Sequence, residues 1–249
     1  MTIMLRPHDF FDLGDSLTAG LFDDCEYVWQ ALWSLKDRLN QLLAGERRIF
    51  GNVMPGAYLG DNPIFVAKGA VVEPSAYILG PAYIGEGAVV RHGALVRNDV
   101  IMLPGSILGH ACETKHSIFL PRAVAAHFNY VGDSILGRRV NLGAGTKLSN
   151  LTIVSEKDPE TKKRPTIKLQ INGVELDTNL AKLGAILGDG VQTGCNAVLN
   201  PGCLIGKNSL IYANLSLRKG YYPPDSIIKL RQSIESVTRR SSIEEPIEY

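Results

Sequence analysis

The sequence predicts a left-handed parallel β-helix, an all-β solenoid wound from six-residue repeats. Residues 66–107 divide into seven hexapeptides, and each opens with an aliphatic residue or methionine. Four positions later each has a small or β-branched residue, namely Ala70, Ala76, Ala82, Ala88, Ala94, Val100 and Ser106. Because an amphipathic helix repeats near 3.6 residues, this period excludes one. Three hexapeptides would complete a coil of about 18 residues, so the stacked coils would form a triangular prism. Each coil buries its core only against its neighbours.

The register of the repeat breaks twice. The first break predicts a loop or irregular coil between Cys112 and Ile118. The second is a polar stretch over 154–182, which predicts a long loop that leaves the prism. Loops of that length in compact domains are usually functional or disordered. Within it, the Ile-Asn-Gly-Val sequence at 171–174 is typical of a β-hairpin turn.

Helical segments are predicted at both ends of the prism. Asp23 or Asp24 would cap a helix that runs to about Leu43. Its apolar side chains recur at helical spacing and predict core or trimer packing: Trp29, Leu32, Trp33, Leu35, Leu39 and Leu42. A second helix is predicted from after Pro224 to about Arg239. Since the open ends of a solenoid need covers, we expect these two helices to provide them.

These features divide the chain into three parts. Residues 1–55 are an N-terminal helical segment, 56–222 are the β-helix domain with the inserted loop 154–182, and 223–249 are a C-terminal helix and tail. The hydrophobic fraction of 45% in 249 residues supports a substantial core, and the formal net charge of +1 gives no reason to expect a nucleic-acid partner. No run reaches the roughly 18 apolar residues that a membrane span requires.

The cysteines and the first residues bear on the cellular compartment. Cys25, Cys112, Cys195 and Cys203 are far apart and form no CxxC motif, which fits reduced thiols in a cytoplasm. Two of them fall at repeat positions that favour a small buried residue, so we expect a packing role. The opening MTIMLRPHDFFDLGD lacks a basic segment followed by an apolar run, and no signal peptide is expected.

The segment 126–150 carries the most specific pattern in the chain. It reads AHFNYVGDSILGRRVNLGAGTKLSN and holds His127, Tyr130, Gly132, Asp133, Asn141, Gly143, Ala144, Gly145, Thr146 and Asn150. With the later stretch LDTNLAKLGAILGDGVQTGCNAVLNPGCLIG, it resembles two families. One is the acetyltransferase half of the bacterial bifunctional enzymes that acetylate and then uridylylate glucosamine-1-phosphate. The other is the archaeal-type sugar-1-phosphate nucleotidylyltransferases with an amino-sugar acetyltransferase tail.

This resemblance spans about residues 66–220. It implies an acetyl-CoA-dependent N-acetyltransferase for an amino-sugar 1-phosphate, with glucosamine-1-phosphate as the first candidate, in a route to UDP-N-acetylglucosamine. It also implies a homotrimer whose sites use residues of neighbouring subunits, and acetyl transfer that needs no metal. The chain has no glycine-rich nucleotide loop, so uridylylation is not expected.

The resemblance also implies roles for ten residues. His127 would be the general base, because an imidazole, with an ordinary pKa of about 6.5, can take the proton of an amine near neutral pH. Asn150 would orient the amine, while Tyr130 and Asn141 would hydrogen-bond the sugar or its phosphate. The residues expected to bind phosphate by charge are Arg97, Lys115 and Lys182. Those at the coenzyme positions are Ala144, Cys195 and Ala213.

Other interpretations stand beside this one. A zinc carbonic anhydrase on the same fold would need three histidines on adjoining coils, and the candidates are His92, His110, His116 and His127. A scaffold without activity, or an acetyltransferase for galactosamine-1-phosphate or a nucleotide-linked amino sugar, would use the same prism. Asparagine also suits tight corners for purely structural reasons. The loop lysines Lys157, Lys162 and Lys163 are rivals for the phosphate.

Overall fold

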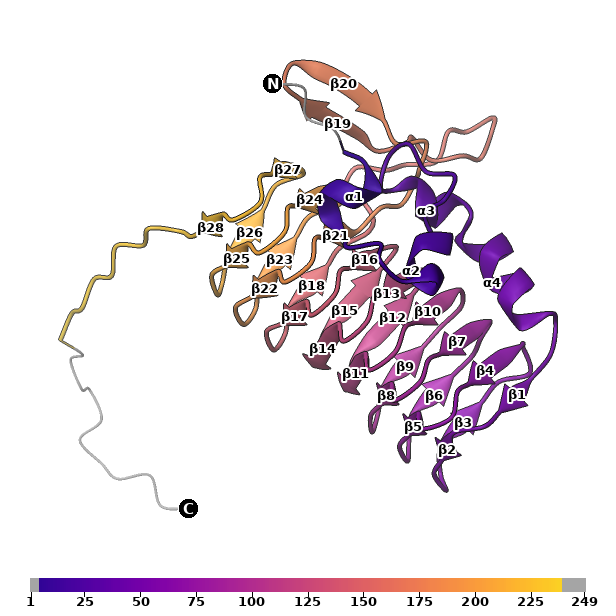
Figure 1. Ribbon diagram of the computed structural model, residues 1–249. Helices are drawn as coiled ribbons and strands as arrows, with labels where there is room; N and C mark the ends of the chain where they lie inside the picture. The colour runs from indigo at the N-terminus through magenta and orange to yellow at the C-terminus, as the bar shows by residue number, and fades with distance from the viewer. Residues whose placement is uncertain (1–4, 239–249) are drawn as a thin grey trace.

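The computed structural model describes residues 5–238, and its main body is a parallel β-solenoid of three sheets (Figure 1). Sheet A contains β1 (Arg48–Ile49), β4 (Ile64–Val66), β7 (Ala82–Ile84), β10 (Val100–Met102), β13 (Ser117–Phe119), β16 (Ile135–Leu136), β21 (Ala185–Leu187), β24 (Cys203–Ile205) and β27 (Gly220–Tyr222). Sheet B contains β2 (Asn52–Val53), β5 (Val71–Val72), β8 (Val89–Val90), β11 (Ile107–His110), β14 (Val124–His127), β17 (Asn141–Leu142), β22 (Gln192–Thr193), β25 (Leu210–Ile211) and β28 (Ile227–Ile228). Sheet C contains β3 (Tyr58–Leu59), β6 (Tyr77–Ile78), β9 (Leu95–Val96), β12 (Glu113–Lys115), β15 (Tyr130–Gly132), β18 (Lys147–Leu148), β23 (Val198–Leu199) and β26 (Ser216–Leu217).

The hexapeptide pattern places its residues as predicted. The residues that open the repeats point into the prism and are fully buried: Val66, Val72, Ile78, Ile84, Val90, Val96 and Met102. The small or β-branched residues four positions later are also buried. Equivalent residues pair in register from coil to coil, as Val66 does with Ile84 and Ile84 with Met102. Each coil therefore stacks its apolar side chains directly on those of the next coil.

Between Cys112 and Ile118, where the sequence predicts a loop or irregular coil, the structure has an irregular coil and no loop. Strand β12 occupies most of this stretch, and the coil is one residue shorter than those before it. Met102 pairs with Phe119, 17 residues on, whereas Ile84 and Met102 are 18 apart. A tight corner with a positive φ of 44° at His116 absorbs the difference. The inward position thus moves to Phe119, and Ile118 faces outward.

The second break is an insertion with its own short structure. The chain leaves the solenoid at Asn150 and returns at Leu183, whose N–H donates to the Asn150 carbonyl at 3.1 Å. The predicted hairpin is confirmed, with β19 (Lys168–Ile171) and β20 (Val174–Asp177) paired antiparallel. Its two turn residues, an asparagine and a glycine, have φ values of 53° and 79°, which a two-residue hairpin turn requires.

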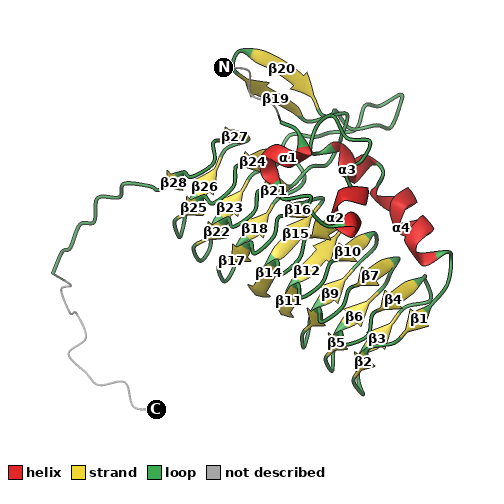
Figure 2. Ribbon diagram, viewed as in Figure 1, coloured by secondary structure: helices red, strands yellow, loops and turns green. Residues whose placement is uncertain are grey.

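The N-terminal segment forms four short helices in place of the one predicted. They are α1 (Pro7–Phe10), α2 (Ser16–Gly20), α3 (Gln30–Trp33) and α4 (Leu35–Leu43). They pack along the outer face of sheet A and do not cover the end of the solenoid (Figure 2). The apolar contacts explain this placement, because Trp29, Leu32, Leu35 and Leu39 join outward residues of sheet A in a second core. Those residues of sheet A are Ile101, Ile118, Ile135, Ile186 and Leu204, and Leu103 and Leu120, which follow β10 and β13, join them.

The predicted C-terminal helix is also wrong within the described residues. Ile227 and Ile228 add strand β28 to sheet B, and residues 229–238 contain no helix. The apolar side chains of this stretch are exposed, and a single short helix without tertiary packing is marginal in water. Arg239, where the helix was expected to end, lies outside the described residues.

Two properties of the whole described chain complete the fold. None of the helices in residues 5–238 has the length and apolar character that crossing a membrane requires. The four cysteines are free thiols, and Cys112 and Cys203 are buried at repeat positions, as a packing role predicts.

Candidate active site

Most of the predicted site residues lie along the two long edges of sheet C. At the corner between sheets B and C, His127, Ala144, Cys195 and Ala213 occupy successive coils, and we name this row the histidine edge. Backbone hydrogen bonds link the neighbouring coils along this row. Gly145 N–H donates to His127 O at 2.9 Å, Asn196 N–H to Ala144 O at 2.8 Å, and Asn214 N–H to Cys195 O at 2.9 Å. The predicted base and the predicted coenzyme positions therefore share one continuous ridge.

Three histidines stand in register on this edge. His127 pairs with His110 on β11, and the rings of His110 and His92 stack with centroids 5.3 Å apart. His110 Nδ1 lies 3.1 Å from the His92 carbonyl, which can only accept, so this nitrogen carries the proton. Within residues 5–238, the exposed imidazole of His127 makes no hydrogen bond of its own. It is therefore free to engage a ligand.

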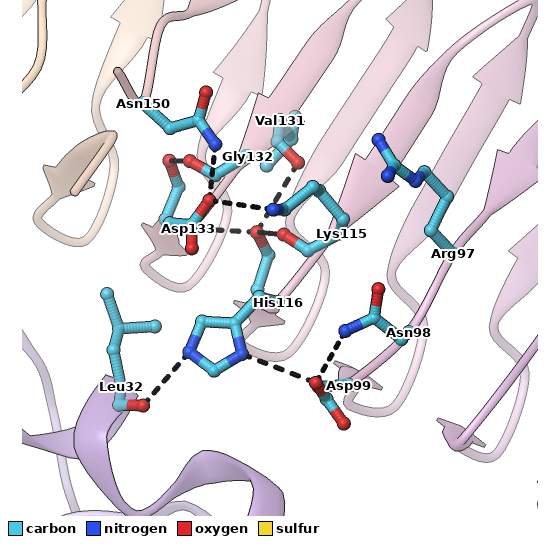
Figure 3. Close-up of polar contacts among 12 residues, drawn as sticks. Leu32, Arg97, Asn98, Asp99, Lys115, His116, Val131, Gly132, Asp133 and Asn150 are labelled. Atoms are coloured by element: carbon cyan, nitrogen blue, oxygen red, sulfur yellow. Dashed lines mark hydrogen bonds and ion pairs between the residues drawn. The ribbon is translucent and has the colours of Figure 1, made fainter. Parts of the chain in front are cut away.

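The second row, at the corner between sheets C and A, is the lysine edge, formed by Arg97, Lys115, Asp133 and Asn150. Lys115 Nζ lies 3.4 Å from Asp133 Oδ2, and the Asn150 side-chain amide donates to the same oxygen (Figure 3). The side chains of Lys115 and Asp133 are only 13% and 9% exposed. Lys115, predicted as a phosphate ligand, thus has its charge already balanced by a nearly buried carboxylate.

The remaining predicted polar residues differ in position. Arg97 Nη1 lies 2.9 Å from Glu113 Oε1, and both side chains are well exposed, at 42% and 35%. Lys182 is exposed at the base of the insertion, one residue before the segment that returns to Asn150. Asn141 stands on the outer face of sheet B, which separates it from the other polar residues expected to bind the sugar.

An open hollow of about 470 Å³ covers sheet C between the two edges. Its lining is Ala111, Glu113, Phe128, Asn129, Tyr130, Lys147, Ser149 and Val198. Tyr130 crosses it, and its hydroxyl donates to Asn150 Oδ1 at 3.3 Å. The ring passes over Gly132, where a Cβ would lie 2.7 Å from the Tyr130 hydroxyl, so a larger residue at this position would displace the ring. A volume of this size suits a small ligand.

Burial raises the pKa of Tyr130, and the charges of Glu113 and Asp133 raise it further. The phenol therefore keeps its proton at neutral pH and remains a hydrogen-bond donor. Because Tyr130 and Asn150 touch each other while His127 stands at the opposite edge, the predicted catalytic pair is separated by the width of sheet C within one chain.

Among the described residues, no group of three or more histidine, cysteine, aspartate or glutamate side chains is placed to hold a metal ion. His116 is turned away from the other histidines, with Nε2 3.0 Å from the Leu32 carbonyl and Nδ1 3.6 Å from Asp99 Oδ2 (Figure 3). The contact with His116 lowers the pKa of Asp99. The hydrogen bond to the Leu32 carbonyl ties the N-terminal helices to the lysine edge and removes His116 from the set that a carbonic anhydrase would need.

Similarity to known proteins agrees with the sequence pattern. The chain is 35% identical over 195 residues to the bifunctional protein GlmU of Methanococcus maripaludis, which covers 78% of this chain and 44% of that protein. It is 30% identical over 193 residues to the bifunctional sugar-1-phosphate nucleotidylyltransferase/acetyltransferase of Sulfurisphaera tokodaii, covering 78% and 45%. The chain is a hexapeptide-repeat protein related to these bifunctional enzymes. It spans less than half the length of either relative.

Two other comparisons add little to this relationship. No protein-family model matches the chain. Among solved structures, the acetyltransferase domain of PglB from Neisseria gonorrhoeae in complex with acetyl coenzyme A is 11% identical to this chain and has a TM-score of 0.26. The match spans 66% of this chain and 50% of the PglB domain.

The sequence assigned no role to several residues of the hollow and of the lysine edge. Asp133 belongs to the motif that carries the resemblance, so a signal for it existed. Glu113 had none, because its pairing with Arg97 joins residues 16 apart on neighbouring coils. Phe128 and Asn129 lie directly after His127, where the resemblance assigns no role.

Proposed function

We propose that the chain is an acetyl-CoA-dependent N-acetyltransferase that acts on an amino-sugar 1-phosphate, with glucosamine-1-phosphate as the preferred substrate. The product would feed the synthesis of UDP-N-acetylglucosamine. The observation that carries the proposal is the ridge on which His127, with an unengaged imidazole, adjoins the row of Ala144, Cys195 and Ala213. The relationship to bifunctional sugar-phosphate enzymes supports the same chemistry.

The reaction follows from the chemistry of an amine and a thioester. The nitrogen of the amino sugar attacks the thioester carbonyl carbon, the C–N bond forms, and the C–S bond breaks. His127 accepts the proton that the nitrogen loses, and this proton then passes to the departing thiolate of coenzyme A. No acyl-enzyme is needed, so Cys195 serves as a small residue beside the coenzyme and not as a nucleophile. No step requires a metal.

The sugar phosphate would meet the exposed cations near the lysine edge. Arg97 offers a guanidinium that can grip a phosphate with two hydrogen bonds. Lys182 stands beside Asn150 at the base of the insertion. Lys115 would contribute positive charge to the site while paired with Asp133. Tyr130 and Asn150 would bind sugar hydroxyls or orient the amine, and Asn141 would contribute from the face of sheet B to the site of a neighbouring subunit.

Acetyl transfer measured across a panel of amino sugars tests this function. Release of free coenzyme A would be followed with glucosamine and galactosamine, each with and without the 1-phosphate, and with nucleotide-linked amino sugars, in buffer without added metal. We expect the highest kcat/KM with glucosamine-1-phosphate. A clear preference for a nucleotide-linked sugar would reassign the substrate, and no transfer to any amine would favour a scaffold without activity.

A homotrimer is the second part of the proposal. The outer face of sheet A is covered by the N-terminal helices, whereas sheet B exposes a column of half-buried aliphatic residues, Val71, Val89, Ile107 and Val124. Packing of three prisms would bury this column and place candidate residues of neighbouring subunits beside His127. Light scattering should give three times the chain mass of 27.1 kDa. A single-chain mass at micromolar concentration would contradict this assembly.

A further inference from the structure

One column of residues beneath the histidine edge changes its residue type along the solenoid. The residue before each strand of sheet C is alanine on four of the eight coils, and three of these alanines are buried, namely Ala76, Ala94 and Ala197. Three consecutive coils break this pattern with Cys112, Asn129 and Thr146, which are at most 2% exposed. A buried asparagine is unfavourable unless each of its polar atoms has a partner. Asn129 therefore needs an explanation beyond packing.

Asn129 joins three coils through its side-chain amide. Its Oδ1 accepts the backbone N–H of His127 at 3.1 Å and the Cys112 thiol at 3.6 Å. Its Nδ2 donates to the carbonyls of Gly143 at 2.8 Å and Thr146 at 3.4 Å. Because an N–H can only donate and a carbonyl can only accept, these partners fix the orientation of the amide. The hydrogen bonds hold the backbone of His127 to the coil that follows it.

The corner that Asn129 closes carries backbone strain. Phe128, between His127 and Asn129, has a φ of 53°, in the left-handed region. The equivalent corner residues are glycine, asparagine, serine or alanine: Ser75, Gly93, Ala111, Gly145, Asn196 and Asn214. A bulky side chain is unusual in that conformation and persists only where its surroundings impose it. The Asn129 amide and the hydrogen bond from Phe128 N–H to His110 O at 3.0 Å impose it here.

We propose that Asn129 is the positioning residue for the base His127. This inference rests on the proposed function, and it assigns to Asn129 the task of fixing the corner from which the imidazole reaches the amine. Proton transfer demands a hydrogen-bond distance in the reacting complex, so a small displacement of the base is costly. Asn129 is 2% exposed at the floor of the hollow, and it acts through its hydrogen bond to the backbone of His127.

The test uses the full-length chain and acetyl-CoA with the best amino sugar of the panel. Asn129→Ala should lower kcat by about 10- to 100-fold and leave the KM for acetyl-CoA within about twofold. Asn129→Ser, which keeps a hydroxyl acceptor for the His127 N–H, should recover part of the loss. The matched control is Thr146→Val on the next coil, whose hydroxyl bonds Thr193 Oγ1 at 2.8 Å and not His127. Thermal melts should show that Asn129→Ala and Thr146→Val are both folded with a lowered Tm. Only Asn129→Ala should have a lowered kcat.

A double-mutant cycle separates positioning from general disturbance of the fold. In the background of His127→Ala there is no base to position, so Asn129→Ala should have no further effect on kcat. An equal loss in both backgrounds would overturn the inference, as would a normal kcat for Asn129→Ala. If His127→Ala itself keeps a normal kcat, there is no base for Asn129 to position, and both the proposed base and this inference fail.

Discussion

Replacing His127 with alanine should lower kcat for acetyl transfer by about 10²- to 10⁴-fold, the usual contribution of a general base. The KM for acetyl-CoA should barely change, because the coenzyme row of the histidine edge is left intact. Steady-state kinetics with varied acetyl-CoA would measure both parameters.

His110→Ala is the matched control for this prediction. His110 pairs in register with His127 one coil earlier and is equally exposed, but its Nδ1 is bound to the His92 carbonyl. We expect its removal to leave kcat near the wild-type value. If the two variants lose activity to the same extent, the loss comes from disturbance of the histidine edge and His127 is not the base.

Replacing Arg97 with alanine should raise the KM for the phosphorylated amino sugar by about 10- to 100-fold, since a hydrogen bond to a charged group contributes about 1.5–3 kcal/mol. The unphosphorylated analogue should be affected little, because it lacks the group that Arg97 binds. The exposed ion pair with Glu113 contributes at most about 1 kcal/mol to stability, so the variant should fold. Kinetics with matched sugars, with and without the phosphate, would measure the difference.

Glu113→Gln distinguishes binding of phosphate from a structural role of the Arg97–Glu113 pair. Loss of the carboxylate frees the guanidinium, so the KM for the phosphorylated sugar should fall severalfold. If the pair matters only to the fold, Glu113→Gln should instead harm activity as Arg97→Ala does. Equal losses of Arg97→Ala on both sugars would equally argue against a phosphate contact.

The parts of the fold that repeat were predictable, because the six-residue period forces each side chain to one side of the prism. Val66, Ile84 and Met102 face inward for that reason, and an asparagine and a glycine specify the hairpin turn locally. The corner at His116 was not predictable, because a one-residue shortening leaves aliphatic residues at both Ile118 and Phe119. Periodicity alone cannot tell which of them faces the core.

The predictions for the two terminal segments were wrong for a different reason. Apolar residues at helical spacing predict an amphipathic element, but they do not specify its partner. Trp29 and Leu32 pack on the outer face of sheet A because that face presents its own apolar residues, among them Ile101 and Ile135. Near the C-terminus, Ile227 pairs with Leu210 and extends sheet B, where propensity favoured a helix.

For the site, the sequence named His127, the small residues of the coenzyme row, Lys115 and Asn150 as candidates, and the structure places the first two on one edge of sheet C and the last two on the other. What the sequence could not supply was the pairing between coils. The carboxylates of Asp133 and Glu113 balance Lys115 and Arg97 through contacts that depend on the stacking of coils. For the same reason, the bonds of Asn129 to the coils before and after it have no signature in the sequence.

Analysis of the sugar product by mass spectrometry tests the central claim most directly. Wild-type protein and the His127→Ala and His110→Ala variants would each be incubated with acetyl-CoA and glucosamine-1-phosphate. We predict an N-acetylated sugar phosphate with the wild-type protein and with His110→Ala, and little or none with His127→Ala over the same interval. Equal formation of the acetylated product by His127→Ala would contradict the assignment of the base, and its absence with the wild-type protein on every amino sugar would contradict the proposed activity.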